Sequence, residues 1–124
     1  MTSQIKLAKK IYEENRDLLV RANKETIDSD YIKEEDVLMI YIGSQKAVSL
    51  SYSIAKEHII VHYNPKNFKI TGFTIPYLKE FVKWHQKLIN GKKSVEEVYK
   101  TKPKEVVDTV ASTGITGLQG YAYA

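Results

Sequence analysis

The feature of this sequence that most restricts its fold is a strict alternation of apolar and small polar residues between positions 48 and 54. Every second residue there is apolar, and the residues between them are Ser49, Ser51 and Ser53. Side chains of a β-strand point alternately to its two faces, so a period of two predicts a strand with one buried and one exposed face. The chain is therefore expected to contain a β-sheet.

Three further segments predict strands that accompany this one. The run from 37 to 42 is continuously apolar, which is typical of a central strand buried on both faces. The Gly-Ser-Gln turn at 43–45 predicts a hairpin to the next strand. Residues 58–63 are β-branched and alternating, and after the proline turn at 64–67 residues 68–73 can supply an edge strand. The sequence thus predicts an antiparallel meander of three to four strands.

Apolar residues at three- and four-residue spacing predict two long amphipathic helices, one before and one after the strands. The first covers residues 3–23, and its apolar stripe has one polar gap, at Asn15. The acidic segment 24–36 that follows is expected to be a solvated loop. The second helix covers residues 75–89, and Thr74 is expected to cap its first turn.

After the second helix the sequence predicts short elements and then an irregular end. Residues 94–99 and 103–112 are each expected to form a short helix, the first capped by serine and the second opened by proline. The remainder has three glycines spaced three apart and is expected to be extended. We therefore expect an α+β chain with one domain at 1–112 and a Gly/Tyr tail at 113–124, a candidate oligomerisation arm.

Composition excludes several classes of protein. A chain of 124 residues with 43% hydrophobic and 27% charged residues is expected to fold around one core. Because cysteine is absent, disulfides, thiolate nucleophiles and cysteine metal sites are excluded. The N-terminal residues lack the apolar stretch of a signal peptide, and the longest apolar run has six residues, Val37 to Ile42. A cytoplasmic location is therefore expected.

Three patterns approach motifs of known chemistry, and each fails for a geometric reason. His58 and His62 have the i, i+4 spacing of a helical zinc site, but in a strand the two rings would lie ~13 Å apart. The Gly-Lys-Lys-Ser run at 91–94 resembles a phosphate loop, but Gln86 replaces the first glycine. The Asp-Ser-Asp start at 28–30 resembles a calcium loop that lacks its glycine and its final glutamate.

The remaining candidate groups do not form a catalytic set. His85 interrupts the apolar stripe of the second helix and is expected to be a hydrogen-bonded core or boundary histidine rather than a general base. The serines at 49–53 have no evident histidine and aspartate partners, so a serine-protease-like triad is not supported. The sequence therefore predicts no catalytic residue, no metal ligand and no cofactor.

Positive charge is concentrated in the middle of the chain. The net charge is +4, and residues 46–104 contain twelve lysines against four glutamates. Lysines that neutralise phosphates release counterions, so such a segment can bind a polyanion; it can equally serve only solubility. The candidate ligand- or nucleic-acid-binding residues are Lys79, Lys83, Lys87, Lys92, Lys93, Lys100, Lys102 and Lys104.

Aromatic residues suggest a protein interface. Nine tyrosines and one tryptophan are present, and both residue types are favoured at interfaces because their rings are amphipathic. Several flank the apolar stripe of the second helix or lie in the tail, which would enlarge the apolar surface beyond one core. The candidate interface residues are Tyr77, Trp84, Tyr99, Tyr121 and Tyr123.

Three functions remain open from the sequence. The first is a small non-enzymatic binding protein, of the kind that viruses and mobile elements use as accessory proteins. It would be homo-oligomeric and would bind a host protein or a phosphate-rich ligand stoichiometrically. The second is a sequence-nonspecific nucleic-acid-binding protein that uses the lysines of 46–104. The third is a small hydrolase or nuclease built on Glu57, Glu80 and the histidines. No membrane partner is expected.

Overall fold

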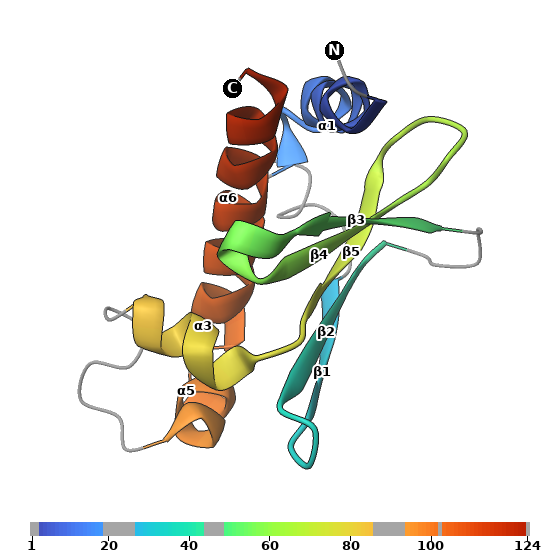
Figure 1. Cartoon of the computed structure of the whole chain (residues 1–124). Coiled ribbons are helices and arrows are strands. Elements are labelled where there is room, and N and C mark those ends of the chain that lie inside the picture. Colours follow the sequence, from blue (N-terminus) through green and yellow to red (C-terminus); the bar gives the residue numbers. More distant parts are fainter. Residues whose placement is uncertain (1–2, 19–26, 44–48, 86–93, 102, 124) are drawn as a thin grey trace.

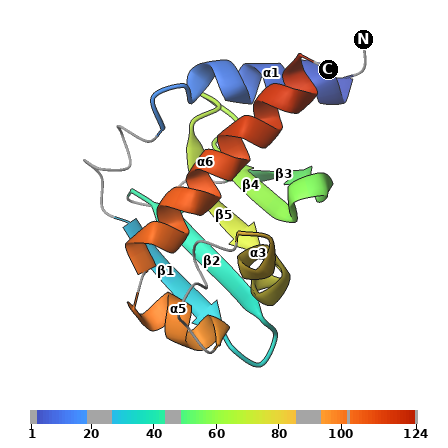
Figure 2. The ribbon, with the colours of Figure 1, turned by 90° about the vertical axis from the view of Figure 1, so that its left-hand side faces the viewer.

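The computed structural model describes residues 3–18, 27–43, 49–85, 94–101 and 103–123. It shows an α+β fold in which an antiparallel sheet is covered by helices on one side (Figures 1 and 2). The described elements are α1 Ser3–Glu14, β1 Ile27–Ile32, β2 Val37–Ile42, β3 Leu50–Ile54, the 3₁₀ turn η1 Ala55–Glu57, β4 Ile59–Tyr63, β5 Ile70–Ile75, α3 Leu78–Trp84, α5 Val95–Thr101 and α6 Pro103–Ala122. The α+β class predicted from the sequence is confirmed.

The sheet has five strands in the order β1-β2-β5-β4-β3, and every neighbouring pair is antiparallel. The predicted meander is correct for β3, β4 and β5, which follow one another in space. The hairpin predicted at 43–45 is wrong, because β2 pairs with β1 and β5, while β3 lies at the far edge. A local turn signal shows that the chain reverses but does not show which strand becomes the neighbour.

The first strand, β1, occupies the acidic segment that the sequence analysis assigned to a loop. Its apolar side chains Ile27 and Tyr31 pack against the core, while Asp28 and Asp30 are exposed. Charged side chains are common on edge strands because they discourage pairing with another chain. The aspartates that suggested a loop therefore belong to the solvent-facing side of an edge strand.

The strand β5 is central rather than at the edge, and it begins and ends two residues later than predicted. Thr74, expected as a helix cap, lies within β5, so the helix after it begins only at Leu78. The first turn of α3 is capped by Asp36, whose carbonyl accepts from Leu78 N–H at 3.1 Å and whose carboxylate accepts from Lys79 N–H at 3.2 Å. This cap comes from the β1–β2 turn, far away in sequence. Of the predicted helix 75–89, residues 86–89 lie outside the described residues.

The helix α1 ends at Glu14, although the sequence predicted a helix as far as residue 23. Residues 15–17 form a turn, and residues 19–23 lie outside the described part of the chain. Asn15 explains the turn, because its side chain is fully buried and is hydrogen-bonded to the backbone of Ile70, the first residue of β5, and to the backbone of Phe68. Its Nδ2 donates to the carbonyls of Ile11 and Phe68, both at 2.7 Å, and its Oδ1 accepts from Ile70 N–H at 2.8 Å.

The C-terminal segment is helical, which corrects the prediction of an extended tail. The helix α6 runs without interruption from Pro103 to Ala122 and lies across the sheet beside α1 (Figure 2). Two glycines allow this close packing: a Cβ at Gly114 would lie 2.8 Å from the Phe73 ring, and one at Gly117 would lie 2.8 Å from Ile54 Cγ2. Glycine lowers the stability of an isolated helix, but here the burial of the helix against the sheet compensates for this loss.

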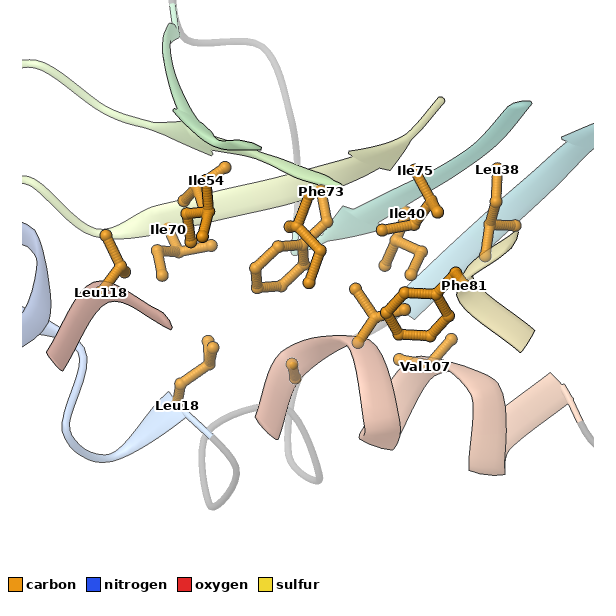
Figure 3. Packing of buried hydrophobic residues seen from close by; sticks show 14 of the residues in the cluster. Leu18, Leu38, Ile40, Ile54, Ile70, Phe73, Ile75, Phe81, Val107 and Leu118 are labelled. Atoms are coloured by element: carbon orange, nitrogen blue, oxygen red, sulfur yellow. The ribbon is translucent and has the colours of Figure 1, made fainter. Parts of the chain in front are cut away.

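The core lies between the sheet and the helices (Figure 3). Ile54 and Phe73 point from the sheet toward α6, and Leu118 and Val107 point back from that helix. The strand β2 is buried on this side only, since its burial alternates along the strand. The prediction that β2 is buried on both faces is therefore wrong, because the described helices cover one face of the sheet. None of the helices in the described residues is long and apolar enough to cross a bilayer.

Candidate binding surface on the open face of the sheet

The side of the sheet opposite the helices, which we call the outer face, is formed by every second residue of each strand (Figure 1). Register places its side chains in two parallel rows that cross all five strands. The first row consists of Asp28, Tyr41, Gly72, His62 and Ser51, and the second of Asp30, Met39, Thr74, Ile60 and Ser53. None of these ten residues is a lysine or an arginine.

His62 lies on the outer face of β4 and is hydrogen-bonded on both sides. Its Nδ1 is 3.0 Å from Ser51 Oγ on β3, and its Nε2 is 2.7 Å from Thr74 Oγ1 on β5. A neutral imidazole has one donor and one acceptor nitrogen, and the two hydroxyls can rotate to match either tautomer. The ring is therefore hydrogen-bonded to both of the strands that flank β4.

A hollow lies beside His62 because the next residue in its row has no side chain. Gly72 separates Tyr41 from His62, and a Cβ at Gly72 would lie 2.3 Å from the carbonyl oxygen of Ile40. Only glycine fits this close approach, so the row has a permanent gap. The resulting hollow has a volume of about 220 Å³, and Met39 and Thr74 are among the residues that line it.

The chemistry of this hollow is that of neutral polar recognition. Burial lowers the pKa of His62, so its ring is neutral at physiological pH and can exchange hydrogen bonds with a bound group. The nearest acidic residue of its row is Asp28, three strands and about 14 Å away. Ser51 and His62 are therefore in contact, but their row has no nearby carboxylate that could orient the imidazole ring and stabilise its positive charge.

The contact between Ser51 and His62 could not be predicted from the sequence. The alternating pattern already placed each residue on one side of its own strand. Register was needed to show that both lie on the same side and directly opposite each other. Within the described residues, no group of three histidine, aspartate or glutamate side chains is arranged to hold a metal ion.

The candidate lysines lie elsewhere, on the helices. Lys79 and Lys83 are exposed on α3, Lys104 is exposed in the first turn of α6, and Lys100 of α5 forms an ion pair of 3.1 Å with Glu96. The helices α3 and α5 and the first turn of α6 lie toward the same end of the molecule (Figures 1 and 2). The other four candidates, Lys87, Lys92, Lys93 and Lys102, lie outside the described residues.

Two of the candidate interface residues form an exposed aromatic group with a histidine. Tyr77 and Trp84 are 55% and 50% exposed, and the ring of His58 is 6.0 Å from Tyr77 and 4.7 Å from Trp84 between centroids. His58 has a positive φ of 55° at the turn into β4, which turns its ring toward α3 and away from His62. The two histidines therefore belong to different sites.

The other three candidate interface residues pack within the chain. Tyr99 shares a hydrogen bond of 2.6 Å with Ser29, which attaches α5 to β1. Tyr121 lies edge-on to Tyr52, and Tyr123 lies edge-on to Tyr12 of α1. These tyrosines thus stabilise the fold, and Tyr123 is also 53% exposed.

The third histidine and the two candidate glutamates are distributed over other elements. His85 follows the last turn of α3 and packs against Phe81 with 4.4 Å between ring centroids and a tilt of 36° between the rings, and its half-buried position is that of a boundary histidine. Glu80 is exposed on α3, and Glu57 is in η1 beside α6. None of these three residues is on the outer face with His62.

Comparison of the chain with protein-family models, with curated protein sequences and with solved structures gives no significant match. Its function is therefore inferred from the geometry of the described residues.

Proposed function

We propose that this chain is a non-enzymatic binding protein whose outer face recognises the surface of another protein. The observation that carries the proposal is that the described helices cover only one side of the sheet, which leaves the other side as a broad, open surface (Figure 1). A sheet face that serves only solubility commonly carries charged and polar residues. This one carries Tyr41 and Met39 beside a preformed hollow, and Ile60 elsewhere in the same two rows.

The residue types of the outer face favour a protein partner. Tyrosine and methionine are enriched at the centres of protein interfaces, and lysine and glutamate are depleted there. Tyr41 is 37% exposed, and its hydroxyl donates to Met39 Sδ at 3.5 Å, so the two side chains form one contact surface beside the hollow. The hydroxyls of the serines and Thr74 surround it with groups that can either donate or accept.

Charge further defines the partner. The only residues of the two rows that are charged at neutral pH are Asp28 and Asp30, both at the β1 side. A polyanion would meet these carboxylates and no cation within the two rows, so a phosphate-rich ligand fits them poorly. The partner expected here is a neutral protein surface with a basic residue placed opposite β1.

The test compares how strongly a partner protein binds to two variants. Each variant replaces one tyrosine by lysine, in one case on the outer face of the sheet and in the other on the helix side. Tyr41→Lys places a charge beside the hollow of the outer face, and Tyr123→Lys places one on the helix side, at a residue that is 53% exposed against 37% for Tyr41. A partner that wild type retains is expected to bind at least about tenfold more weakly to Tyr41→Lys and equally well to Tyr123→Lys. Equal binding to both variants would contradict the proposal, provided that both unfold at the wild-type temperature.

A second candidate, nucleic-acid binding, is favoured by a different observation. Exposed Trp84 and Tyr77 share the neighbourhood of α3 with Lys79 and Lys83, and bases stack on aromatic rings while lysines contact phosphates. If this surface binds single strands, Trp84→Ala should weaken binding of a fluorescent oligonucleotide at low salt about tenfold or more. Lys9→Ala on α1 is the control. Absence of binding by wild type at micromolar concentration would exclude this function.

A further inference from the structure

The two edges of the sheet differ in how they are protected from pairing. An edge strand exposes unpaired backbone N–H and C=O groups, which bind another extended chain unless charges, proline or a covering element prevent it. On β1 the exposed aspartates provide this protection. On β3, whose sequence is Leu-Ser-Tyr-Ser-Ile, there is no charged residue and no proline. Among the described residues, β3 pairs with β4 alone, so its second edge is free of a described strand.

An apolar side chain at the start of β3 is exposed without a role in the fold. Leu50 lies on the same side of the strand as buried Tyr52 and Ile54, since the three alternate with the serines. The other two are buried by α1 and α6, whereas Leu50 remains 48% exposed. A leucine on the helix side of a strand edge is positioned to be covered by something that the edge binds.

A hollow lies at the other end of the same edge. It has a volume of about 300 Å³ and is lined by Ile54, by the charged residues Lys56 and Glu57, and by the α6 segment from Thr116 to Tyr121. A Cβ at Gly120 would meet nothing within 4 Å, so space for a side chain remains there. The hollow and Leu50 are therefore on the same side of β3 and at opposite ends of it.

We propose that β3 pairs antiparallel with β3 of a second copy of this chain, about a two-fold axis at Tyr52. This register sets Leu50 of each copy opposite Ile54 of the other. Each exposed leucine then enters the hollow of the partner copy, and the same contact is made twice, as two-fold symmetry requires. On the outer face, Ser51 of one copy lies opposite Ser53 of the other, and no like charges meet.

This pairing has two structural consequences. The two five-stranded sheets become one continuous ten-stranded sheet, and both free β3 edges are removed. Because the two copies then belong to one sheet, their outer faces lie on the same side of it and join into one larger surface. The dimer thus leaves the outer face open and is independent of whichever partner binds there.

The register is tested directly by engineered disulfides, for which the absence of native cysteine is an advantage. In the proposed pairing, residues 51 and 53 of different copies are direct cross-strand neighbours with Cβ atoms about 5 Å apart. Residue 51 and its own counterpart are about 8 Å apart, beyond disulfide reach. A mixture of Ser51→Cys and Ser53→Cys chains should therefore form a linked heterodimer under mild oxidation, and each variant alone should form little.

The contact between leucine and hollow is tested by a pair of variants in sedimentation velocity. Leu50→Lys removes the inserted side chain, and Gly120→Leu fills the hollow from within the same chain while adding a better helix former. Both variants are expected to be monomeric at concentrations at which wild type is dimeric. Tyr77→Lys, a change at a comparably exposed residue on α3, should remain dimeric.

Three results would overturn the proposal. The first is a wild-type chain that stays monomeric up to about 100 µM, the concentration range in which weak strand pairing is still detected. The second is a dimer that persists in both Leu50→Lys and Gly120→Leu. The third is a disulfide yield that is as high for either cysteine variant alone as for the mixture. Thermal unfolding of each variant shows whether it has kept the wild-type fold.

Discussion

At the scale of single residues, buried polar side chains decide where elements end and how they join. Asn15 ends α1 and at the same time satisfies backbone groups of Phe68 and Ile70 beside β5. These two partners are more than fifty positions away in sequence, so the gap in the apolar stripe could be recognised but its purpose could not. A buried backbone group that loses its partner costs free energy, which gives this residue a measurable role.

Replacing Asn15 by alanine is expected to lower the free energy of unfolding by about 2–4 kcal/mol, because the Ile70 N–H and the Phe68 carbonyl would be buried without this partner. Urea unfolding followed by circular dichroism measures the change. Asn67→Ala is the control, since Asn67 is exposed and its side chain accepts only from Lys69 N–H nearby. Equal losses for both variants would show that Asn15 does not join α1 to β5.

His62 predicts a pH dependence with a definite sign. Burial lowers its pKa below the ordinary value of 6.5, so near that pH the unfolded chain binds more protons than the folded one. Stability contributed by His62 is therefore complete above about pH 6.5 and decreases as the pH falls from there toward the folded pKa. In urea unfolding between about pH 7.5 and 5.5, His62→Gln should flatten this decrease. Identical pH profiles for wild type and variant would contradict it.

At the scale of elements, the spacing of glycines in α6 determines how that helix meets the sheet. Gly114 and Gly117 let the helix approach Phe73 and Ile54, whereas Gly120 faces open space. The same pattern suggested a tail without regular structure, because glycine is unfavourable in an isolated helix. The favourable burial of Leu118 and Ala122 against the sheet and α1 outweighs that cost.

Two alanine substitutions in α6 should therefore have opposite effects. Gly114→Ala forces a Cβ within 2.8 Å of the Phe73 ring and should destabilise the protein by about 1–3 kcal/mol. Gly120→Ala meets no neighbour and should stabilise it by about 0.5–1 kcal/mol through helix propensity alone. Thermal or urea unfolding measures both. A gain in stability from Gly114→Ala would mean that α6 does not pack closely on β5.

At the scale of the whole molecule, the described residues form one helical layer on one sheet, and no described helix or strand covers the other face or the outer edge of β3. The outer face supports the proposed recognition of a protein, and the β3 edge supports the proposed dimer. The described candidate lysines, Lys79, Lys83, Lys100 and Lys104, lie on α3, α5 and the first turn of α6, and none of them is on the outer face or on β3. The candidate surfaces are thus separate, and each can be removed by substitution while the others remain.

A chain that ends at Ser112 tests whether α6 belongs to the domain. The truncation removes Leu118 and Ala122 from the core and uncovers Ile54, and loss of one buried leucine alone costs about 2–5 kcal/mol. Because small domains have a stability of about 5–15 kcal/mol, we expect no cooperative thermal transition. A chain ending at Ala122 is the control. A wild-type transition in the shorter chain would support the extended tail instead.

The strands and helices with regular patterns were predicted best from the sequence. Alternation identified β3 and β4, and three- and four-residue spacing identified α1 and most of α3. The prediction failed where distant residues supply the stabilising contact. The cap of α3 comes from Asp36, the end of α1 from contacts beside β5, and the helical form of residues 113–122 from packing on the sheet.

By itself the sequence determined that this chain has an α+β fold, that its strand at 50–54 has one buried and one exposed face, and that its serines lie on the exposed face. Local side-chain periodicity is sufficient for this, since it depends only on how a strand alternates. Only the tertiary structure decided that this strand lies at an edge and that Ser51 meets His62. Strand order and register depend on contacts between segments far apart in sequence, and no local pattern contains that information.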